Sequence, residues 1–299
     1  MTQPSHSKQK KDAFSYNPKS KEKRISQALK TAFTYFLLCL GGFIFLVPFF
    51  WMLSTSLKDS SVIFQFPPQW IPDPIVWGNY VEAMTFAPFH LFFLNSLTIA
   101  GLSMIGEVFT GALVAYGFAK LQFKGRDTLF IIVLATMMLP GEVTMIPVFI
   151  MFAHIGWIDT YLPLIVPSYF GGGAFFIFMF RQFFLGIPNE LEDAARIDGC
   201  NTFQIFYRIV LPLSKPALAV VAIFSFHGKW NDFLGPLIYL NTMEKFTVQL
   251  GLAMFQGMFQ TEWSLLMAAS IVALLPVLLI FFMFQKYFIE GIKLSGIKG

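Results

Sequence analysis

Long stretches of apolar residues without any charge dominate the chain between residues 30 and 286. A membrane-spanning helix needs about 20 predominantly apolar residues. Three uncharged stretches meet this length with 27, 21 and 23 residues, and they cover 31–57, 160–180 and 263–285. The pattern therefore predicts three membrane-spanning helices.

Three further apolar stretches enclose one or two ionisable residues each. They are 91–118 with Glu107, 129–152 with Glu142, and 216–240 with Lys229 and Asp232. Ionisable side chains within a span usually face the protein interior or water, so they are compatible with a membrane helix. We therefore predict an all-α integral membrane protein with six transmembrane helices over residues 31–286.

Composition supports a lipid environment. Of the 299 residues, 56% are hydrophobic and 13% are charged, whereas soluble domains have roughly 45–50% apolar and about 25% charged residues. The mean hydropathy is +0.64. These values exclude a soluble enzyme, a disordered regulator and a secreted disulfide scaffold. The chain has two cysteines, Cys39 in an apolar stretch and Cys200 in a polar one, which are too few and too differently placed to indicate a disulfide framework or a zinc site.

The basic residues lie mostly on one side of the predicted membrane. With six spans, 18 of the 21 Lys and Arg residues fall on the side that holds both termini. Short cytoplasmic loops are enriched in Lys and Arg, so we expect both termini to be cytoplasmic. Residues 1–30 then form a basic cytoplasmic arm, and residues 287–299 form a cytoplasmic tail.

Sequence motifs for catalysis are missing. The chain has no phosphate-binding loop of the G-x-x-x-x-G-K-[ST] type, no G-x-S-x-G and no H-E-x-x-H. Its four histidines lack metal-ligand spacing. We therefore expect no catalytic residues, no bound cofactor and no metal site. A channel or a transporter fits better than a membrane enzyme.

One cytoplasmic loop, 187–212, has the pattern of two short capped helices. Pro188 suits a first helical position, and Gly199 suits the left-handed end of a helix, so a first helix is predicted over 188–198. Asn201 then caps a second helix, with Gln204 as its capping-box partner. Pro212 is expected to end this second helix.

The second helix is predicted to be amphipathic. Phe203, Phe206, Tyr207 and Val210 follow at i, i+3, i+4 and i+7, which places them on one face. From the residues alone, this face could dock on another protein or lie on the membrane interface.

The same loop resembles a family signature. Asp193-Ala194-Ala195, Gly199, Ile209, Leu211 and Pro212 look like the E-A-A-x-x-x-G-x9-I-x-L-P signature of membrane subunits of binding-protein-dependent ABC importers. Asp193, preceded by Glu192, replaces the usual first Glu. Similar patterns over about 31–299 resemble the carbohydrate uptake class, especially the smaller membrane subunit of the maltose-transporter type.

The resemblance implies a type I importer permease fold with a cytoplasmic coupling-helix loop. Its implied partners are a homologous membrane subunit, two ABC ATPase subunits that use ATP and Mg, and an extracytoplasmic binding protein that delivers a sugar. It also implies a bacterial or archaeal inner membrane. The ATPase-coupling residues would be Glu192, Asp193, Ala194, Ala195, Gly199, Ile209, Leu211 and Pro212.

Two alternatives remain at this point. In an ion-coupled secondary transporter, Glu107, Glu142, Lys229 and Asp232 would form a relay, but the chain shows no inverted repeat with broken helices. A structural scaffold would have no transport path.

Several residues have two possible roles. Glu142, Asn231 and Tyr239 are candidates for a translocation path, with ordinary helix packing or capping as the favoured reading. Lys229 and Asp232 lie three residues apart in the predicted span 216–240, so they project from nearly the same helix face. They either neutralise each other, which is the favoured reading, or line a water-filled path.

Overall fold

The computed structural model describes residues 18–257 and 261–296, with side chains for 26–257 and 261–286. More than half of the predicted basic arm therefore lies outside the described residues, and only backbone is described in the C-terminal tail. Regular structure in the described residues is helical, and the one β pairing among them is an isolated bridge between Gln256 and Thr261. The all-α prediction is confirmed.

The chain divides into two compact units, Met1–Trp51 and Met52–Gly299. The described part of the first unit is a single helix, α1 (Pro18–Ser56), whose last residues belong to the second unit. The predicted span 31–57 falls on α1, which is apolar enough to cross a membrane over Ser26–Ser56.

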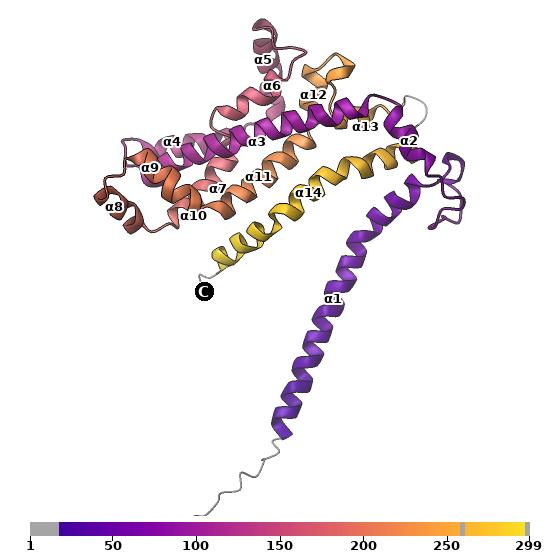
Figure 1. Cartoon of the computed structure of the whole chain (residues 1–299), viewed down its shortest axis with the longest axis horizontal. Coiled ribbons are helices and arrows are strands. Elements are labelled where there is room, and N and C mark those ends of the chain that lie inside the picture. Colours follow the sequence, from indigo (N-terminus) through magenta and orange to yellow (C-terminus); the bar gives the residue numbers. More distant parts are fainter. Residues whose placement is uncertain (1–17, 258–260, 297–299) are drawn as a thin grey trace, which may run out of the picture. The chain divides into compact units, whose positions relative to one another are not determined.

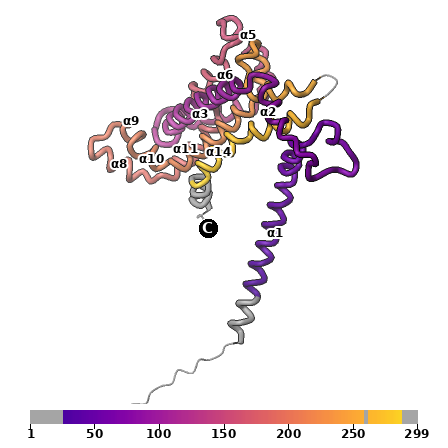
Figure 2. The backbone as a smooth tube through the Cα atoms, turned by 45° about the vertical axis from the view of Figure 1, so that its right-hand side comes forward, coloured from indigo at the N-terminus to yellow at the C-terminus, as the bar shows by residue number. Residues whose placement is uncertain are grey.

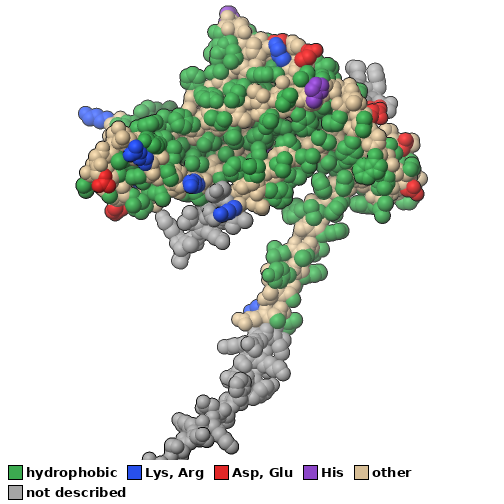
Figure 3. All heavy atoms as spheres, viewed as in Figure 1, with side chains coloured by type: hydrophobic (Ala, Val, Ile, Leu, Met, Phe, Trp, Pro, Cys, Tyr) green, Lys and Arg blue, Asp and Glu red, His purple; other side chains and the backbone are tan. Residues whose placement is uncertain are grey.

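Four helical segments among the described residues are long and apolar enough to span a membrane, and up to six if two sharply bent pairs are each one span. Besides α1, they are α3 (Phe89–Lys120), the segment Leu162–Leu185 and the apolar part of α14 (Trp263–Gly296). Leu162–Leu185 consists of α6 (Leu162–Ile165), η3 (Val166–Tyr169) and α7 (Ala174–Leu185). Green apolar side chains cover most of the described surface in Figure 3, as expected for a surface solvated by lipid.

The predicted helix 129–152 is not continuous. It is split into α4 (Arg126–Ala135) with η2 (Thr136–Met138), and α5 (Gly141–His154), and the two parts meet at 96°. Pro140 explains the break, because a proline disfavours helical backbone in the residue before it. Leu139 accordingly has ψ 115°.

The predicted helix 216–240 is also interrupted. α11 (Lys215–Trp230) ends at Trp230, and the chain resumes a helix only at α12 (Leu234–Tyr239). Pro236 lies in the first turn of α12, where its missing N–H costs no helical hydrogen bond. The residues between, 231–233, are non-helical.

Three consecutive glycines interrupt the span 160–180. Gly171, Gly172 and Gly173 have φ of 98°, 69° and 82°, so they form a turn between η3 and α7 rather than part of a helix. A Cβ on Gly172 would lie 2.5 Å from the backbone oxygen of Glu107. The turn therefore approaches α3 so closely that only glycine fits.

Helix α3 lies at the centre of the second unit. It packs against α11 and α7, and Figures 1 and 2 both show it running beside α11. Phe89 and Phe92 of α3 belong to one buried core with Phe226 and Trp230 of α11. Tyr116, near the other end of α3, belongs to a second core with α7 and the coupling loop.

The remaining elements are short. They are η1 (Ser60–Val62), α2 (Gly78–Thr85), α8 (Asn189–Ile197), α9 (Thr202–Ile205), the π-helical turn η4 (Phe206–Val210), α10 (Leu211–Leu213), η5 (Met243–Lys245) and α13 (Val248–Ala253).

Candidate coupling loop and membrane cavity

The coupling loop 187–212 starts with the predicted helix. α8 covers Asn189–Ile197, directly after Pro188. Gly199 has φ 82°, and the N–H of Cys200 donates to the carbonyl of Ala195 at 2.9 Å. This left-handed end matches the prediction for Gly199.

The predicted capping box at Asn201 is present. The backbone N–H of Gln204 donates to Asn201 Oδ1 at 2.9 Å, and Gln204 Oε1 accepts from the backbone N–H of Asn201 at 2.8 Å. These two bonds begin α9 immediately after the Gly199 turn, so the loop holds its second helix at a fixed angle to the first.

The second helix differs from its prediction. α9 is followed by the π-helical turn and by α10, and Pro212 lies inside α10 rather than at its end. Proline has no N–H to donate to the carbonyl four residues before it, so one helical hydrogen bond is missing at Pro212. The wider π-helical turn comes directly before this position. This segment, Thr202–Leu213, meets α11 at 80°.

The π turn also divides the predicted apolar face. Phe206 and Val210 are buried in the core. Phe203 and Tyr207 stay exposed, with ring centroids 5.8 Å apart. Half of the predicted face therefore packs inside the chain itself, which leaves Phe203 and Tyr207 as the outward apolar side chains.

The predicted coupling residues point in different directions. Glu192 and Ala195 are buried, Ile209 and Leu211 are half-buried, and Asp193, Ala194, Gly199 and Pro212 are exposed. Asp193 forms a surface ion pair with Arg196 at 3.2 Å. Asp193 and Ala194 are thus available to a partner, whereas Glu192 is turned inward.

Glu192 faces Lys120 at the C-terminal end of α3. Its Oε1 lies 3.3 Å from Lys120 Nζ, and both side chains are 4% exposed. Lys120 is one of the 18 basic residues on the predicted cytoplasmic side, and no sequence motif marks it as a functional residue. The signal that could have found it is a lone basic residue at the end of a long helix, but its partner cannot be read from spacing, because 72 positions separate the two.

A cavity of about 310 Å³ lies among α3, α7 and α11. It is lined by Glu107, Phe176, Phe224, Ser225, Gly228, Lys229 and Asp232. Glu107 is buried, and its carboxylate accepts hydrogen bonds from Ser225 Oγ at 2.6 Å and Ser168 Oγ at 3.1 Å. Two rings and three ionisable groups therefore face one space.

The predicted pair of Lys229 with Asp232 is wrong. Lys229 Nζ lies 3.4 Å from Glu107 Oε1, and the described residues include no ion pair between Lys229 and Asp232. Because α11 ends at Trp230, the two residues do not share a helix face. Asp232 Oδ1 instead accepts from the backbone N–H of Gly235 at 3.1 Å, in the first turn of α12.

The three candidate path residues lie away from this cavity. Glu142 is exposed in the first turn of α5. Asn231 is exposed and bonds with His227 and Gln249. Tyr239 stacks on Phe149 with centroids 6.2 Å apart. Of the intramembrane residues singled out in the sequence, the structure therefore brings Glu107, Lys229 and Asp232 to the cavity.

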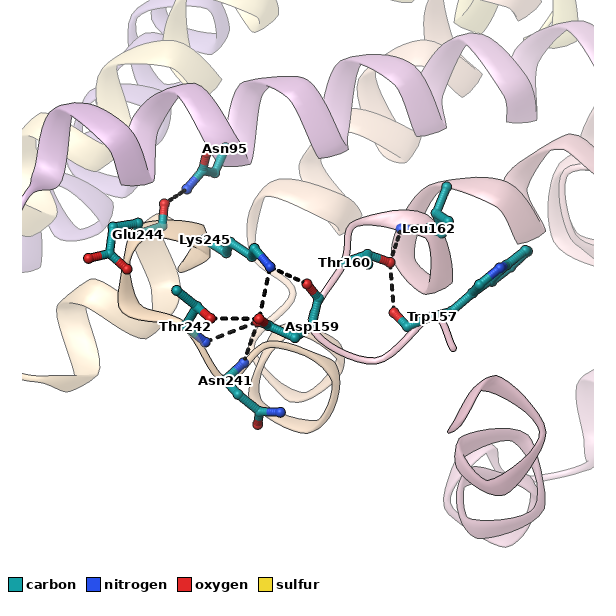
Figure 4. Close-up of polar contacts among 9 residues, drawn as sticks. All are labelled: Asn95, Trp157, Asp159, Thr160, Leu162, Asn241, Thr242, Glu244 and Lys245. Atoms are coloured by element: carbon teal, nitrogen blue, oxygen red, sulfur yellow. Dashed lines mark hydrogen bonds and ion pairs between the residues drawn. The ribbon is translucent and has the colours of Figure 1, made fainter. Parts of the chain in front are cut away.

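A second polar cluster joins two loops near the other end of α3. Figure 4 shows Asn241, Thr242 and Lys245 converging on Asp159, whose backbone has φ 57°. Lys245 Nζ lies 2.8 Å from Asp159 Oδ2, and Thr242 Oγ1 donates to the same oxygen at 2.6 Å. The bond from Lys245, followed by those from Thr242 and Asn241, holds the pKa of Asp159 well below its usual range.

Metal-ligating groups do not gather in the described residues, where no set of three His, Cys, Asp or Glu side chains could hold an ion.

Comparison with known proteins places these features in context. The family described as "Binding-protein-dependent transport system inner membrane component" matches residues 107–294. The arabinooligosaccharides transport system permease protein AraQ of Bacillus subtilis (strain 168) is 38% identical over 273 residues, which cover 90% of this chain and 96% of that protein.

Two solved structures share the fold. The crystal structure of a bacterial ABC transporter involved in the import of the acidic polysaccharide alginate matches with a TM-score of 0.74 and 23% identity, covering 91% of this chain and 99% of that chain. A bacterial alginate ABC transporter in complex with an alginate pentasaccharide-bound periplasmic protein matches with a TM-score of 0.60 and 18% identity, covering 87% and 95%.

Proposed function

Because the chain belongs to the binding-protein-dependent transport system inner membrane component family, we propose that it forms half of the translocation path of an ABC importer for a sugar or oligosaccharide. A homologous membrane subunit supplies the other half. An extracytoplasmic binding protein delivers the substrate, and two ATPase subunits bind ATP and Mg and dock on the coupling loop 187–212. Both termini are cytoplasmic.

The observation that carries this proposal is the coupling loop. It presents Asp193, Ala194 and the apolar Ile197 and Phe203, which are 86% and 56% exposed. Two capped short helices hold them in a fixed arrangement. Exposed apolar side chains between charged ones suit a protein partner, whereas a lipid-resting face would need Phe206 and Val210, which are buried.

The cavity supports a saccharide substrate. Sugar hydroxyls can bond to Lys229 and Asp232, while the apolar faces of a sugar ring can pack on Phe176 and Phe224. The relative AraQ is named for arabinooligosaccharides, and the first structural relative is titled for alginate. An oligosaccharide is therefore the substrate class that we propose.

Reconstituted transport tests the proposal. The chain should be purified with its second membrane subunit, its ATPases and its binding protein, and placed in vesicles. We expect uptake of a labelled arabino-oligosaccharide that requires ATP and persists when a protonophore removes the proton gradient. Uptake without ATP, or uptake abolished by the protonophore while ATP is present, would favour the ion-coupled alternative. The purified chain alone should hydrolyse no ATP.

A further inference from the structure

Lys120 holds the coupling loop by three contacts at the C-terminal end of α3. Its Nζ donates to the carbonyl of Ile187 at 2.6 Å and to Asn189 Oδ1 at 2.8 Å, and it forms the ion pair with Glu192. All three acceptors lie at the start of the coupling loop, on α8 or just before it. One ammonium group therefore joins α3 to the first coupling helix.

The pair is buried on the Glu192 side as well. Tyr116 Oη lies 3.4 Å from Glu192 Oε2, and Arg196 Nη2 lies 3.8 Å from the same oxygen. Removing one partner of a buried ion pair leaves the other charge without compensation, which destabilises that arrangement. A displacement of α8 along α3 would break these contacts and leave the buried Glu192 and Lys120 charges uncompensated.

Helix α3 carries a second ion pair, at the cavity. Glu107 lies 13 residues before Lys120, which is about 20 Å along a helix at 1.5 Å per residue. α3 is a single helix of 32 residues without an internal proline. Two residues of α3 connect it to the two features of interest. Lys120 contacts the coupling loop, and Glu107 contacts Lys229 and Ser225 at the cavity.

We infer that Lys120 is a positioning residue whose contacts make α3 the rigid connection between the coupling loop and the cavity. This inference rests on the proposed function, in which the ATPase subunits move the loop. When they displace α8, the bonds of Lys120 oblige the end of α3 to follow, and the displacement reaches Glu107 and Lys229. The peptide links from α7 to α8 and from α9 to α11 join the loop to the membrane helices too, so loss of Lys120 weakens transmission rather than abolishing it.

Substitution of Lys120→Met tests the inference, with Lys124→Met as the matched control. Lys124 is exposed in the same cytoplasmic turn and forms no ion pair in the described part of the chain. The reconstituted complex should be assayed for its assembled amount, its ATP hydrolysis and its sugar uptake. We expect Lys120→Met to assemble and hydrolyse ATP but to move about fivefold less sugar per ATP, the lower end of ordinary coupling factors.

A conservative change and a direct probe separate positioning from folding. Lys120→Arg keeps the charge and should recover most of the ratio, while Glu192→Gln, which retains shape, should lower it. A single cysteine at cavity residue Phe224 should change its rate of thiol labelling on addition of ATP and vanadate in the parent complex. That change should be smaller in Lys120→Met.

Two outcomes would overturn the inference, and a third would overturn the proposed function instead. It is overturned if Lys120→Met moves as much sugar per ATP as Lys124→Met. It is also overturned if assembly, hydrolysis and uptake fall together at a constant ratio, because Lys120 then only stabilises the fold. If the parent chain binds no ATPase subunits at all, the proposed function fails instead, so the two failures are distinguishable.

Discussion

Glu107 and Lys229 form an ion pair at the cavity. The surroundings of each charge determine how much the protein is destabilised when its partner is removed. Glu107 keeps two serine hydroxyl donors when Lys229 is removed, whereas Lys229 has a side chain 29% exposed and so reaches water. The pair therefore matters less than a fully buried one, whose disruption costs about 3–5 kcal/mol.

We predict that Lys229→Met lowers the amount of folded complex and that adding Glu107→Gln restores it, since the double variant leaves no uncompensated charge. Lys229→Met with Asp232→Leu should not restore it, because Asp232 caps α12 and does not pair with Lys229. Quantitative blotting of the membrane fraction measures both. Recovery with Asp232→Leu instead would mean that the Lys229–Asp232 pair forms in the complex.

Asp159 provides a pH-dependent prediction. Its pKa is depressed in the folded protein, so its stabilising contribution is complete above the unfolded pKa of about 4 and is lost as pH falls through the lower folded value. The difference in unfolding temperature between the parent and Asp159→Asn should therefore stay constant from pH 8 to pH 5. A difference that already shrinks between pH 7 and pH 5 would contradict the assignment, and Glu244→Gln, whose side chain is exposed, serves as the control.

Local chemistry at the residue scale could be predicted where it depends on near neighbours in sequence. The Asn201–Gln204 capping box and the left-handed Gly199 are present because they depend on three or four adjacent residues. The partners of Glu107 and Lys120 could not be predicted, because their contacts join segments 122 and 72 positions apart. Only the packing of α3 against α11 and α8 brings them together.

At the scale of elements, apolar periodicity located the helices but not their breaks. Pro140 and the glycines 171–173 were visible in sequence, yet membrane helices often tolerate such residues when neighbours satisfy the freed backbone groups. At these two sites the chain turns instead, by 96° at Pro140. The turn at Gly172 is fixed by its close approach to α3.

At the scale of helices, Gly199 gives a testable prediction about how α9 is placed after α8. Its φ of 82° disfavours any β-branched residue, although a Cβ there would meet no atom within 4 Å. Gly199→Val should therefore tilt α9 away from α8 and reduce copurification of the ATPase subunits. Gly199→Asn should retain them, since asparagine adopts left-handed backbone more readily.

Equal ATPase recovery with Gly199→Val and Gly199→Asn would show that the turn between α8 and α9 does not set the docking surface. The docking surface would then depend on α8 alone.

At the scale of the whole molecule, the testable property is the orientation of the chain in the membrane, which the distribution of Lys and Arg residues predicts. In a background with Cys39 and Cys200 replaced by serine, cysteines at Ser61 and Met243 should react with an impermeant thiol reagent added outside. Both positions are exposed, Ser61 in the short helical turn η1 and Met243 in η5. A cysteine at Lys124 should react only after permeabilisation, and its labelling in intact cells would reverse the proposed topology.

At Gly172 the glycine turn lies directly against the backbone of α3. A methyl group there would press on the Glu107 oxygen and on Gly111 Cα, which are backbone atoms that cannot rotate away. Even Gly172→Ala would therefore push the glycine turn away from α3. The separation between this turn and α3 is thus set partly by the missing side chain of Gly172, and Gly172→Ala is the smallest substitution expected to increase it.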